Sequence, residues 1–372
     1  MRILQVLTLL SPDGAFGGPA RVALNQSAEL IRQGHDVTVA AGARGYRVLP
    51  TEVDGVPVRL FGARRLLPVR GFTGTGAPGL VRWFHARGAD FDAVHIHFGR
   101  DLVALPVAVA ARRRRIPYVL QTHGMVVPSG HPLAGPLDAL CTRRLLRDAQ
   151  ATLYLTDQER EQLSEVARAQ LRFVPVGNGV PDYPRASPPR GQPEVLFIAR
   201  MHARKRPLMF VDMAKALLDE GLDARFTLVG PDEGQGAAVL AAIKGDPRIS
   251  WEGALAPAAI PARMAAANVY VLPSEREPYP MSMLEAMSVG LPVVVSADCG
   301  LAPLVTRAGC GIVTDGEMPA FAAAVKTILG DESLARTMSE RARETAHSEF
   351  SMGAVAERLI TVYNECRNAA PT

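Results

Sequence analysis

Short apolar runs alternate with amphipathic stretches along almost the whole chain, and this alternation restricts the fold more than any other feature. The apolar run 2–9 is followed by the helix-like stretch 20–34, and the pair recurs up to the run 171–177. Such spacing predicts parallel strands joined by crossover helices. Because these crossovers are right-handed, helices cover both faces of the sheet. The first half is therefore predicted to be a doubly wound, Rossmann-like α/β domain.

The alternation is interrupted once and then resumes. Residues 178–194 are rich in proline and glycine and lack periodicity, as is typical of a linker, and a second parallel series begins at the run 195–200. A chain of 372 residues also exceeds the size at which single cores stop growing. We expect two Rossmann-like domains facing a central cleft, residues 1–183 and 192–350, with the C-terminal helical stretch 352–372 packed on the first.

Composition excludes several classes of protein. Hydrophobic residues make up 48% and charged residues 21% of the chain, as in globular domains with full cores. The first apolar run is too short for a signal peptide or a membrane span. The four cysteines, none of them spaced as in a zinc site or a disulfide framework, are Cys141, Cys299, Cys310 and Cys366. We therefore expect a cytoplasmic protein.

Positive charge is concentrated in the first half of the chain. Residues 1–180 carry 22 Arg and Lys against 14 Asp and Glu, whereas the rest carries 19 against 23. Arg143, Arg144 and Arg147 share one amphipathic stretch, which indicates either peripheral contact with an anionic membrane or an ordinary solvated helix. The run Arg112–Arg115 ends a helix-like stretch, where positive charge is favourable in any case. Nucleic acid is not expected as a partner, because the basic residues are not interleaved with aromatic ones.

The segment around Glu277 carries the most specific motif. Two prolines and a helix-like start separate Glu277 from Glu285. Because prolines prevent a helix from running through Glu277, we expect that residue in a loop, a helix beginning near Met281, and Glu285 one turn into it. The backbone N–H groups at that helix start, those of Met281, Ser282 and Met283, favour an anion such as a diphosphate.

The two glutamates and two upstream cations complete a set of groups suited to a sugar and a diphosphate. Glu277 can accept hydrogen bonds from sugar hydroxyls, and Glu285 can accept them from the vicinal hydroxyls of a ribose. Arg200 and Lys205 follow the apolar run that begins the second series, where both could stabilise a departing diphosphate. For the cations taken alone, a solvated basic loop is the alternative.

Gly17 and Gly18 follow the first apolar run, so a phosphate or sugar could approach the backbone there closely. The spacing is not G-x-G-x-x-G, which disfavours a dinucleotide-binding loop. A purely structural glycine turn is the alternative.

Together these motifs are similar to family 4 of the retaining glycosyltransferases, which has the GT-B fold. The resemblance spans nearly the whole chain and rests on Arg200, Lys205, the two glutamates, Gly17–Gly18, residues 122–124 (THG) and residues 178–180 (NGV). It implies that the two cations contact the donor diphosphate, that Glu277 contacts the transferred sugar, and that Glu285 contacts the ribose. It also implies that no metal ion or other cofactor is required. Where the family commonly has glycine, this chain has Pro280.

The resemblance extends the set of site residues. It places the nucleobase near Trp251, Glu252 and Gly253, while Gly230 could allow close approach or could be an ordinary turn glycine. The expected donor-binding residues are Gly17, Gly18, Arg200, Lys205, Gly230, Trp251, Glu252, Gly253, Glu277, Tyr279, Pro280, Met281, Ser282, Met283 and Glu285. The expected catalytic residues are His123, Glu277, Arg200 and Lys205.

Histidines end two predicted strands of the first domain. His123 precedes a glycine and, with the resemblance, is expected to orient a hydroxyl of the donor sugar. His97 ends the preceding strand and is expected to face the acceptor, whereas His95 is expected on the opposite strand face and packed. Asn178, beside the linker, is a further candidate acceptor contact, with a hinge or a donor contact as alternatives.

The function implied by the resemblance is that of a retaining, metal-independent hexosyltransferase. It would move a sugar from a UDP- or GDP-sugar to a saccharide or lipid-linked acceptor bound by the first domain, in bacterial polysaccharide, glycolipid or other glycoconjugate synthesis, in the cytoplasm or at the inner face of the membrane. Because no nucleophile is evident, the departing phosphate oxygen would take the acceptor proton. The alternatives are a nucleotide-sugar 2-epimerase of GT-B fold, an NAD-dependent dehydrogenase and a non-catalytic nucleotide-binding protein.

Overall fold

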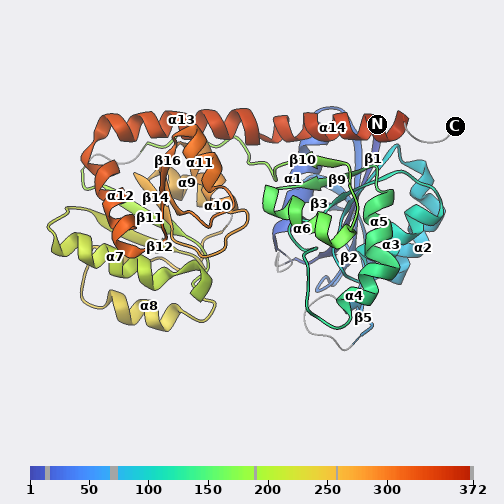
Figure 1. Ribbon diagram of the computed structural model, residues 1–372, viewed down its shortest axis with the longest axis horizontal. Helices are drawn as coiled ribbons and strands as arrows, with labels where there is room; N and C mark the ends of the chain where they lie inside the picture. Colours follow the sequence, from blue (N-terminus) through green and yellow to red (C-terminus); the bar gives the residue numbers. More distant parts are fainter. Residues whose placement is uncertain (13–16, 68–73, 188–190, 257–258, 369–372) are drawn as a thin grey trace. The chain divides into compact units, whose positions relative to one another are not determined.

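The chain forms two compact units, each with its own sheet (Figure 1). The computed structural model describes residues 1–12, 17–67, 74–187, 191–256 and 259–368, so residues 188–190 of the predicted linker and 369–372 of the predicted last helix lie outside it. Unit 1 comprises Met1–Gly179 and Met352–Thr372, and unit 2 comprises Val180–Ser351. The boundary falls at the start of the predicted linker, because Val180 is buried in the core of unit 2 and its N–H donates to the carbonyl of Phe350 at 2.7 Å.

Unit 1 is built on an eight-stranded sheet with the order β10-β9-β8-β7-β1-β2-β4-β3, in which only the short β3 pairs antiparallel. The strands are β1 (Arg2–Leu10), β2 (Asp36–Ala43), β3 (Glu52–Val53), β4 (Val56–Gly62), β7 (Ala93–His97), β8 (Tyr118–Gln121), β9 (Ala151–Tyr154) and β10 (Phe173–Pro175). A separate ribbon pairs β5 (Arg64–Arg65) with β6 (Thr75–Gly76).

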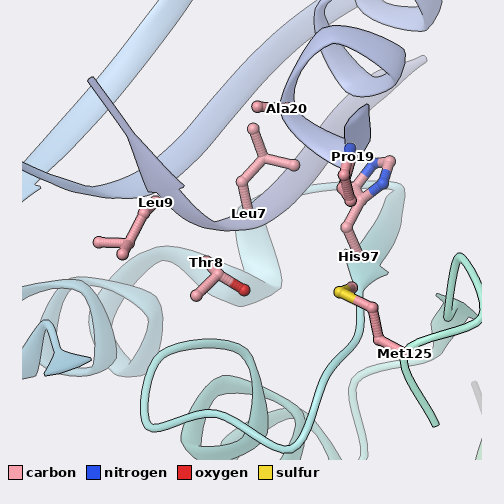
Figure 2. A pocket seen from close by; sticks show the side chains of 7 residues that line it. All are labelled: Leu7, Thr8, Leu9, Pro19, Ala20, His97 and Met125. Carbon is pink, nitrogen blue, oxygen red and sulfur yellow. The ribbon is translucent and has the colours of Figure 1, made fainter. Parts of the chain in front are cut away.

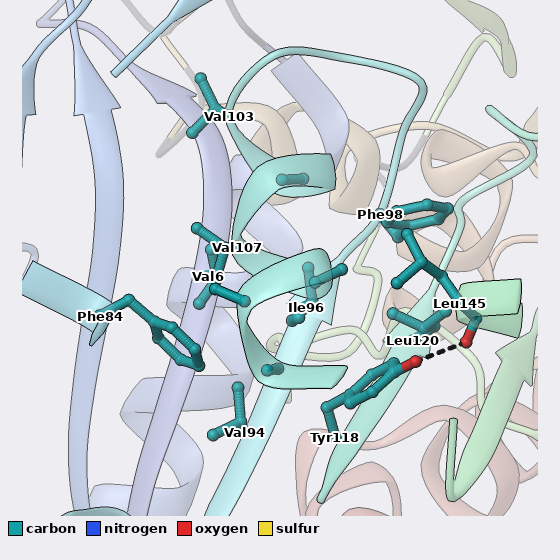
Figure 3. Close-up of a cluster of buried hydrophobic side chains, with 14 of the residues drawn as sticks. Val6, Phe84, Val94, Ile96, Phe98, Val103, Val107, Tyr118, Leu120 and Leu145 are labelled. Carbon is teal, nitrogen blue, oxygen red and sulfur yellow. Dashed lines mark hydrogen bonds between the residues drawn. The ribbon is translucent and has the colours of Figure 1, made fainter. Parts of the chain in front are cut away.

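Helices cover both faces of this sheet, as predicted. On one face, apolar side chains of the sheet such as Val6 and Ile96 pack against Phe84, Val107 and Leu145 (Figure 3). These three residues belong to α2 (Pro78–Arg87), α3 (Ala104–Arg113) and α5 (Arg143–Asp148). The other face is covered by α1 (Gly17–Arg32) and the C-terminal helix α14 (Met352–Asn368). The remaining elements of unit 1 are η1 (Gly88–Asp90), α4 (Ala134–Leu137), the π-helical turn η2 (Asp138–Thr142) and α6 (Asp157–Ala167).

Unit 2 has a fully parallel six-stranded sheet with the order β13-β12-β11-β14-β15-β16. The strands are β11 (Glu194–Ile198), β12 (Arg225–Val229), β13 (Ile249–Trp251), β14 (Val269–Leu272), β15 (Val293–Ser296) and β16 (Gly311–Thr314). One core lies under α9 (Ile260–Ala265), α10 (Met281–Val289), α11 (Ala302–Ala308) and α13 (Glu332–Phe350). The other lies under α7 (Pro207–Asp219), α8 (Gly236–Ile243) and α12 (Met318–Gly330), and the short helix η3 (Ala203–Lys205) precedes α7.

Two of the three arginines of α5 have partners inside unit 1. Arg143 Nε and Arg147 Nη2 donate, at 3.1 and 2.9 Å, to the last carbonyl groups of α6, and Arg112 forms an ion pair with Asp148. These contacts explain two of the three arginines of the predicted membrane-facing stretch without a membrane, while Arg144 is exposed. In the part of the chain that the structure describes, no helix is long and apolar enough to cross a membrane.

Candidate functional site

Both sheets reverse their strand order at one point, and ligands of open parallel sheets bind beside the carboxyl ends of the strands at such a point. In unit 2 the reversal lies between β11 and β14, because β12 and β13 extend the sheet on one side and β15 and β16 on the other. In unit 1 it lies between β1 and β7. Several of the predicted site residues end or directly follow these strands.

Lys205 and Glu277 form an ion pair at the reversal point of unit 2. Lys205 ends η3, after β11, and Glu277 lies in the loop after β14. Both side chains are largely buried, with 13% and 9% of their surface exposed, and Lys205 Nζ bonds Glu277 Oε2. The guanidinium of Arg204, which the sequence did not single out, lies 3.9 Å from the same carboxylate. The structure thus brings two predicted site residues together and adds a second cation.

Backbone hydrogen bonds fix the loop that carries Glu277. The N–H of Glu275 donates to the carbonyl of Arg204 at 2.9 Å, and the N–H of Gly300 donates to the carbonyl of Glu277 at 2.8 Å. Gly300 has to be glycine, because a Cβ there would lie 2.1 Å from the carbonyl oxygen of Pro278. Segments that follow β11 and β15 therefore hold this carboxylate in place.

Helix α10 begins at Met281, as predicted, with Pro280 as its N-cap residue. One detail differs from the prediction: the N–H of Met283 already donates to the carbonyl of Pro280 at 3.1 Å. Of the three predicted amides, those of Met281 and Ser282 are left for an anion. The buried Tyr270 ties this helix start to the sheet, since its hydroxyl contacts Ser282 Oγ at 2.7 Å and the last carbonyl of β11 at 3.2 Å. No local sequence pattern indicates this role.

Arg200 and Glu285, the other two charged residues expected to contact the donor diphosphate and ribose, are more exposed than Glu277. Arg200 lies in the loop after β11 with 53% of its side chain exposed, and its Nη1 bonds both carboxylate oxygens of Glu233 at 2.8 Å. An anion that binds Arg200 therefore has to share or displace Glu233. Glu285 is half-buried one turn into α10, and the partly buried Tyr279 packs against the core under that helix.

The predicted nucleobase region is already engaged in internal bonds. The carboxylate of Glu252 pairs with Arg263 at 2.9 Å, and the indole N–H of Trp251 donates to the carbonyl of Gly230 at 2.9 Å. The N–H of Gly230 in turn donates to the carbonyl of Gly253 at 2.8 Å. Gly230 has a φ of +143°, and a Cβ there would lie 2.0 Å from a carbonyl oxygen of the loop after β11. The positive φ and the neighbouring backbone therefore account for this glycine without a ligand, which favours a structural turn glycine over close approach of the donor.

Four buried polar side chains, which we call the polar row, lie across the centre of the unit 1 sheet. They are Gln5 on β1, His95 and His97 on β7, and Gln121 on β8. His95 is packed, as expected, but its expected position on the opposite face from His97 is wrong. Residues two apart on a strand share a face, and the two imidazole rings stack with centroids 4.5 Å apart.

His97 has both ring nitrogens bonded inside unit 1. Its Nδ1 bonds His123 Nε2 and its Nε2 bonds Gln5 Oε1, both at 2.7 Å. The structure therefore places His97 as a partner of His123, whereas we expected it to face the acceptor. Burial lowers the pKa of His95 to about 3, that of His97 well below its ordinary value, and that of His123 to about 4. All three imidazoles are consequently neutral near pH 7.

His123 lies in a loop that is tied to α6. The residue has a φ of 52° and is partly exposed, but its Nδ1 is buried. The buried carboxylate of Glu159 accepts hydrogen bonds from the N–H of Gly124, at 2.6 Å, and from the hydroxyl of Thr122, so it holds the loop on both sides of His123. The capping-box spacing of Thr156 and Glu159, in which Thr156 accepts from the N–H of Glu159 at 3.2 Å, is the sequence signal that could have found this carboxylate.

A small apolar cavity of about 40 Å³ lies beside His97 at the reversal point of unit 1 (Figure 2). Its lining consists of Leu7, Thr8, Leu9, Pro19, Ala20, His97 and Met125. Asn178, the other predicted acceptor contact, is buried, and its Oδ1 accepts a hydrogen bond of 3.5 Å from Gln121. Both predicted acceptor residues thus direct polar atoms into the interior of unit 1.

Helix α1 begins at Gly17, and Gly18 is exposed in its first turn. Among the described residues, nothing would lie within 4 Å of a Cβ at Gly18, and its φ is not in the positive region. Neither packing nor backbone conformation explains this glycine, in contrast to Gly230. In the same described ranges, no cluster of His, Cys, Asp and Glu side chains is arranged to hold a metal ion.

Two doubly wound parallel sheets, each with candidate ligand groups at its strand reversal, define a protein of the GT-B class. Residues 17–179 match the Glycosyl transferase 4-like domain, and residues 182–345 match Glycosyl transferases group 1. The chain therefore belongs to family 4 of the glycosyltransferases, nucleotide-sugar-dependent retaining enzymes, and the resemblance inferred from the sequence is confirmed.

Similar proteins cover nearly the whole chain. It is 25% identical to alpha-D-kanosaminyltransferase from Streptomyces kanamyceticus, over 97% of this chain and 99% of that protein. It is 26% identical to D-inositol 3-phosphate glycosyltransferase from Kineococcus radiotolerans, over 94% of this chain and 91% of that protein. The solved structure of Anabaena HepE in complex with UDP covers 98% of this chain and 100% of its own, with a TM-score of 0.77 at 20% identity. These structural matches confirm the predicted fold class.

Proposed function

We propose that unit 2 binds a nucleoside diphosphate sugar and that unit 1 binds the acceptor. For the donor we propose a UDP-sugar in preference to a GDP-sugar. The observation that carries this proposal is the buried pair of Lys205 and Glu277 at the strand reversal of unit 2. It places a cation suited to a diphosphate beside a carboxylate suited to sugar hydroxyls. Uridine is favoured because the similar Anabaena HepE has been solved with UDP and with UDP-glucose.

The proposed hexosyl transfer needs no metal and no side-chain base. The bond between the anomeric carbon and the leaving phosphate oxygen breaks, and the acceptor oxygen bonds the same face of the sugar while its proton passes to that phosphate oxygen. Lys205, Arg200 and the first amides of α10 stabilise the diphosphate charge. Glu277 holds a sugar hydroxyl, Glu285 holds the ribose, and His123 orients another sugar hydroxyl.

For the acceptor we propose a small polyhydroxylated molecule in preference to a lipid-linked one. The names of the curated relatives specify D-inositol 3-phosphate and 2-deoxystreptamine. Arg143 and Arg147, which suggested a membrane surface, are bonded to α6 within unit 1. The apolar cavity beside His97 is the recess we assign to a carbon-rich face of the acceptor.

A panel of nucleotides and sugar nucleotides tests the donor assignment. We expect UDP and UDP-glucose to raise the Tm, because a ligand at about 100 times its Kd stabilises the native state by about 2.7 kcal/mol, whereas NAD should not. Incubation with candidate acceptors should give a product whose anomeric configuration, read by NMR, equals that of the donor. Isomerisation of the donor without an acceptor would favour the epimerase, and a Tm response to NAD alone would contradict the proposal.

The contrast between two glycines gives a prediction for the donor site. Gly18→Ala is expected to raise the KM for the donor roughly tenfold, a loss of about 1.4 kcal/mol of binding, while the Tm stays unchanged. Gly230→Ala, the matched variant, should instead lower the Tm, because a Cβ there meets backbone at 2.0 Å. Steady-state kinetics and thermal melts measure both effects. An unchanged KM for Gly18→Ala would remove this residue from the donor site.

A further inference from the structure

A continuous path of side-chain contacts links the C-terminal helix to His123. The hydroxyl of Tyr363 on α14 bonds His95 Nδ1 at 2.7 Å, although the two residues are 268 positions apart. The ring of His95 stacks on that of His97 with an interplanar angle of 19°. His97 stacks in turn on His123, at 5.0 Å between centroids and 6° between planes, and bonds it at 2.7 Å. Tyr363 therefore lies at the far end of a path that reaches a proposed donor contact.

The hydrogen bonds along this path determine which nitrogens carry protons. Gln5 accepts through Oε1, so His97 Nε2 carries the hydrogen and its Nδ1 has a lone pair. His97 Nδ1 must then accept from His123 Nε2–H at 2.7 Å. The orientation and tautomer of His123 thus depend on where the ring of His97 lies.

Uncharged polar side chains surround the middle of the path, while the carboxylate of Glu159 holds the loop at its His123 end. Gln5, Gln121 and Gln26 approach it from β1, β8 and α1, and the side chains of all three are buried. The edge of the Tyr363 ring meets His95 at 5.9 Å between centroids, so the tyrosine gives both a hydrogen bond and a packing surface. Tyr363 itself is fully buried, and its neighbours Leu359 and Val362 on α14 pack in the apolar part of the same face.

We propose that Tyr363 is a positioning residue for sugar transfer, which holds His95 and, through the stacked His97, fixes the orientation of His123. This inference rests on the role proposed above for His123. The positioning role explains why polar side chains occupy the polar row, where leucine or valine would pack without the need for hydrogen bonds. It also gives α14 a part in the reaction beyond covering the sheet of unit 1.

Tyr363→Phe tests the proposal, because it removes the hydroxyl and keeps the ring. We expect the kcat to fall roughly tenfold, as a small misplacement of a reacting-site group allows, with the KM for the donor unchanged. Val362→Ala is the matched control: it weakens packing of the same helix without touching the path, and its kcat should stay within twofold of wild type when both variants are assayed well below their Tm.

The same substitution in a His123→Ala background separates positioning from structure. There, Tyr363→Phe should cause no further fall in kcat, and in the wild-type background it should shift the ¹⁵N resonance of His123 Nε2, which Val362→Ala should not. His95→Gln, which breaks the middle of the path, should lower kcat by a similar factor and not add to Tyr363→Phe.

An equal fall of kcat in both backgrounds would show a merely structural effect and overturn the proposal. If Tyr363→Phe had the wild-type kcat while His123→Ala had a lowered kcat, the positioning role of Tyr363 would be overturned and the role of His123 would stand. A wild-type kcat for His123→Ala would overturn the proposed role of His123 itself, and the positioning role with it.

Discussion

Lys205→Met is expected to lower the kcat of sugar transfer by roughly 10²–10³-fold, the usual cost of removing a group that stabilises charge developing in a transition state. Lys205 is the most buried of the proposed diphosphate contacts, with 13% of its side chain exposed against 53% for Arg200. A charge acts more strongly where water is excluded. Arg200→Ala should therefore have the smaller effect, since Arg200 is half-exposed and already shares its charge with Glu233. Steady-state kinetics with saturating donor and acceptor measure both variants.

The loss of Lys205 also leaves the buried carboxylate of Glu277 with only the more distant Arg204, at 3.9 Å, and full loss of a buried partner costs about 3–5 kcal/mol of stability. The double variant Lys205→Met/Glu277→Gln is the control, because it removes both charges and should recover most of the Tm. We expect the double variant to remain as slow as the single one. Recovery of kcat together with the Tm would show that Lys205 acts through folding, and a wild-type kcat for Lys205→Met would remove it from the diphosphate site.

The local structure around Glu277 could be predicted from the sequence, whereas its partner could not. Pro278 and Pro280 restrict the backbone directly, so the loop and the start of α10 at Met281 follow from neighbouring residues. Lys205 lies 72 positions away from Glu277 and meets it only because β11 and β14 are neighbours in the sheet. Alternating apolar runs predict strands but do not specify the order in which the strands pair. The ion pair of Lys205 and Glu277 could therefore not be predicted from these runs.

In the interior of unit 1, too, one part of the structure could be predicted from the sequence and another could not. Gln5, His97 and Gln121 each interrupt a run that is otherwise apolar, and this was a visible sign of a buried polar network, since buried polar groups need partners. Placing His97 toward the acceptor missed that sign. The partner of His95, Tyr363, comes from a helix at the other end of the chain, and no local pattern marks it. Contacts such as that between Tyr363 and His95 depend on packing between distant segments. The periodicity of apolar residues along the chain contains no information about such packing.

The three stacked histidines are expected to make unit 1 lose stability steeply in mild acid. The folded pKa values of His95, about 3, and His123, about 4, lie far below the ordinary 6.5, and that of His97 is lowered as well. Below pH 6.5 the unfolded chain therefore binds protons that the folded chain does not, so the free energy of unfolding falls as the pH falls. The stabilisation is fully present above about pH 7 and is lost progressively as the pH falls from 6.5 toward 4. Between pH 7.5 and pH 5 the loss is about 2 kcal/mol for each of His95 and His123, and the lowered pKa of His97 acts in the same direction.

The two tryptophans allow this loss to be assigned to one unit, because Trp83 lies in unit 1 and Trp251 in unit 2. The three stacked histidines all belong to unit 1, so the unfolding of unit 2 should respond less to pH. Urea denaturation can be followed by fluorescence in two variants: Trp251→Phe leaves Trp83 to report on unit 1, and Trp83→Phe leaves Trp251 to report on unit 2. Between pH 7.5 and pH 5 the urea midpoint of unit 1 should move several-fold further than that of unit 2. His95→Gln should reduce that movement, because glutamine takes up no proton, whereas substitution of the exposed His85 by glutamine should not. Equal movement of the two midpoints would contradict neutral histidines in the interior of unit 1, and with them the hydrogen-bond pattern that directs His97 Nδ1 toward His123.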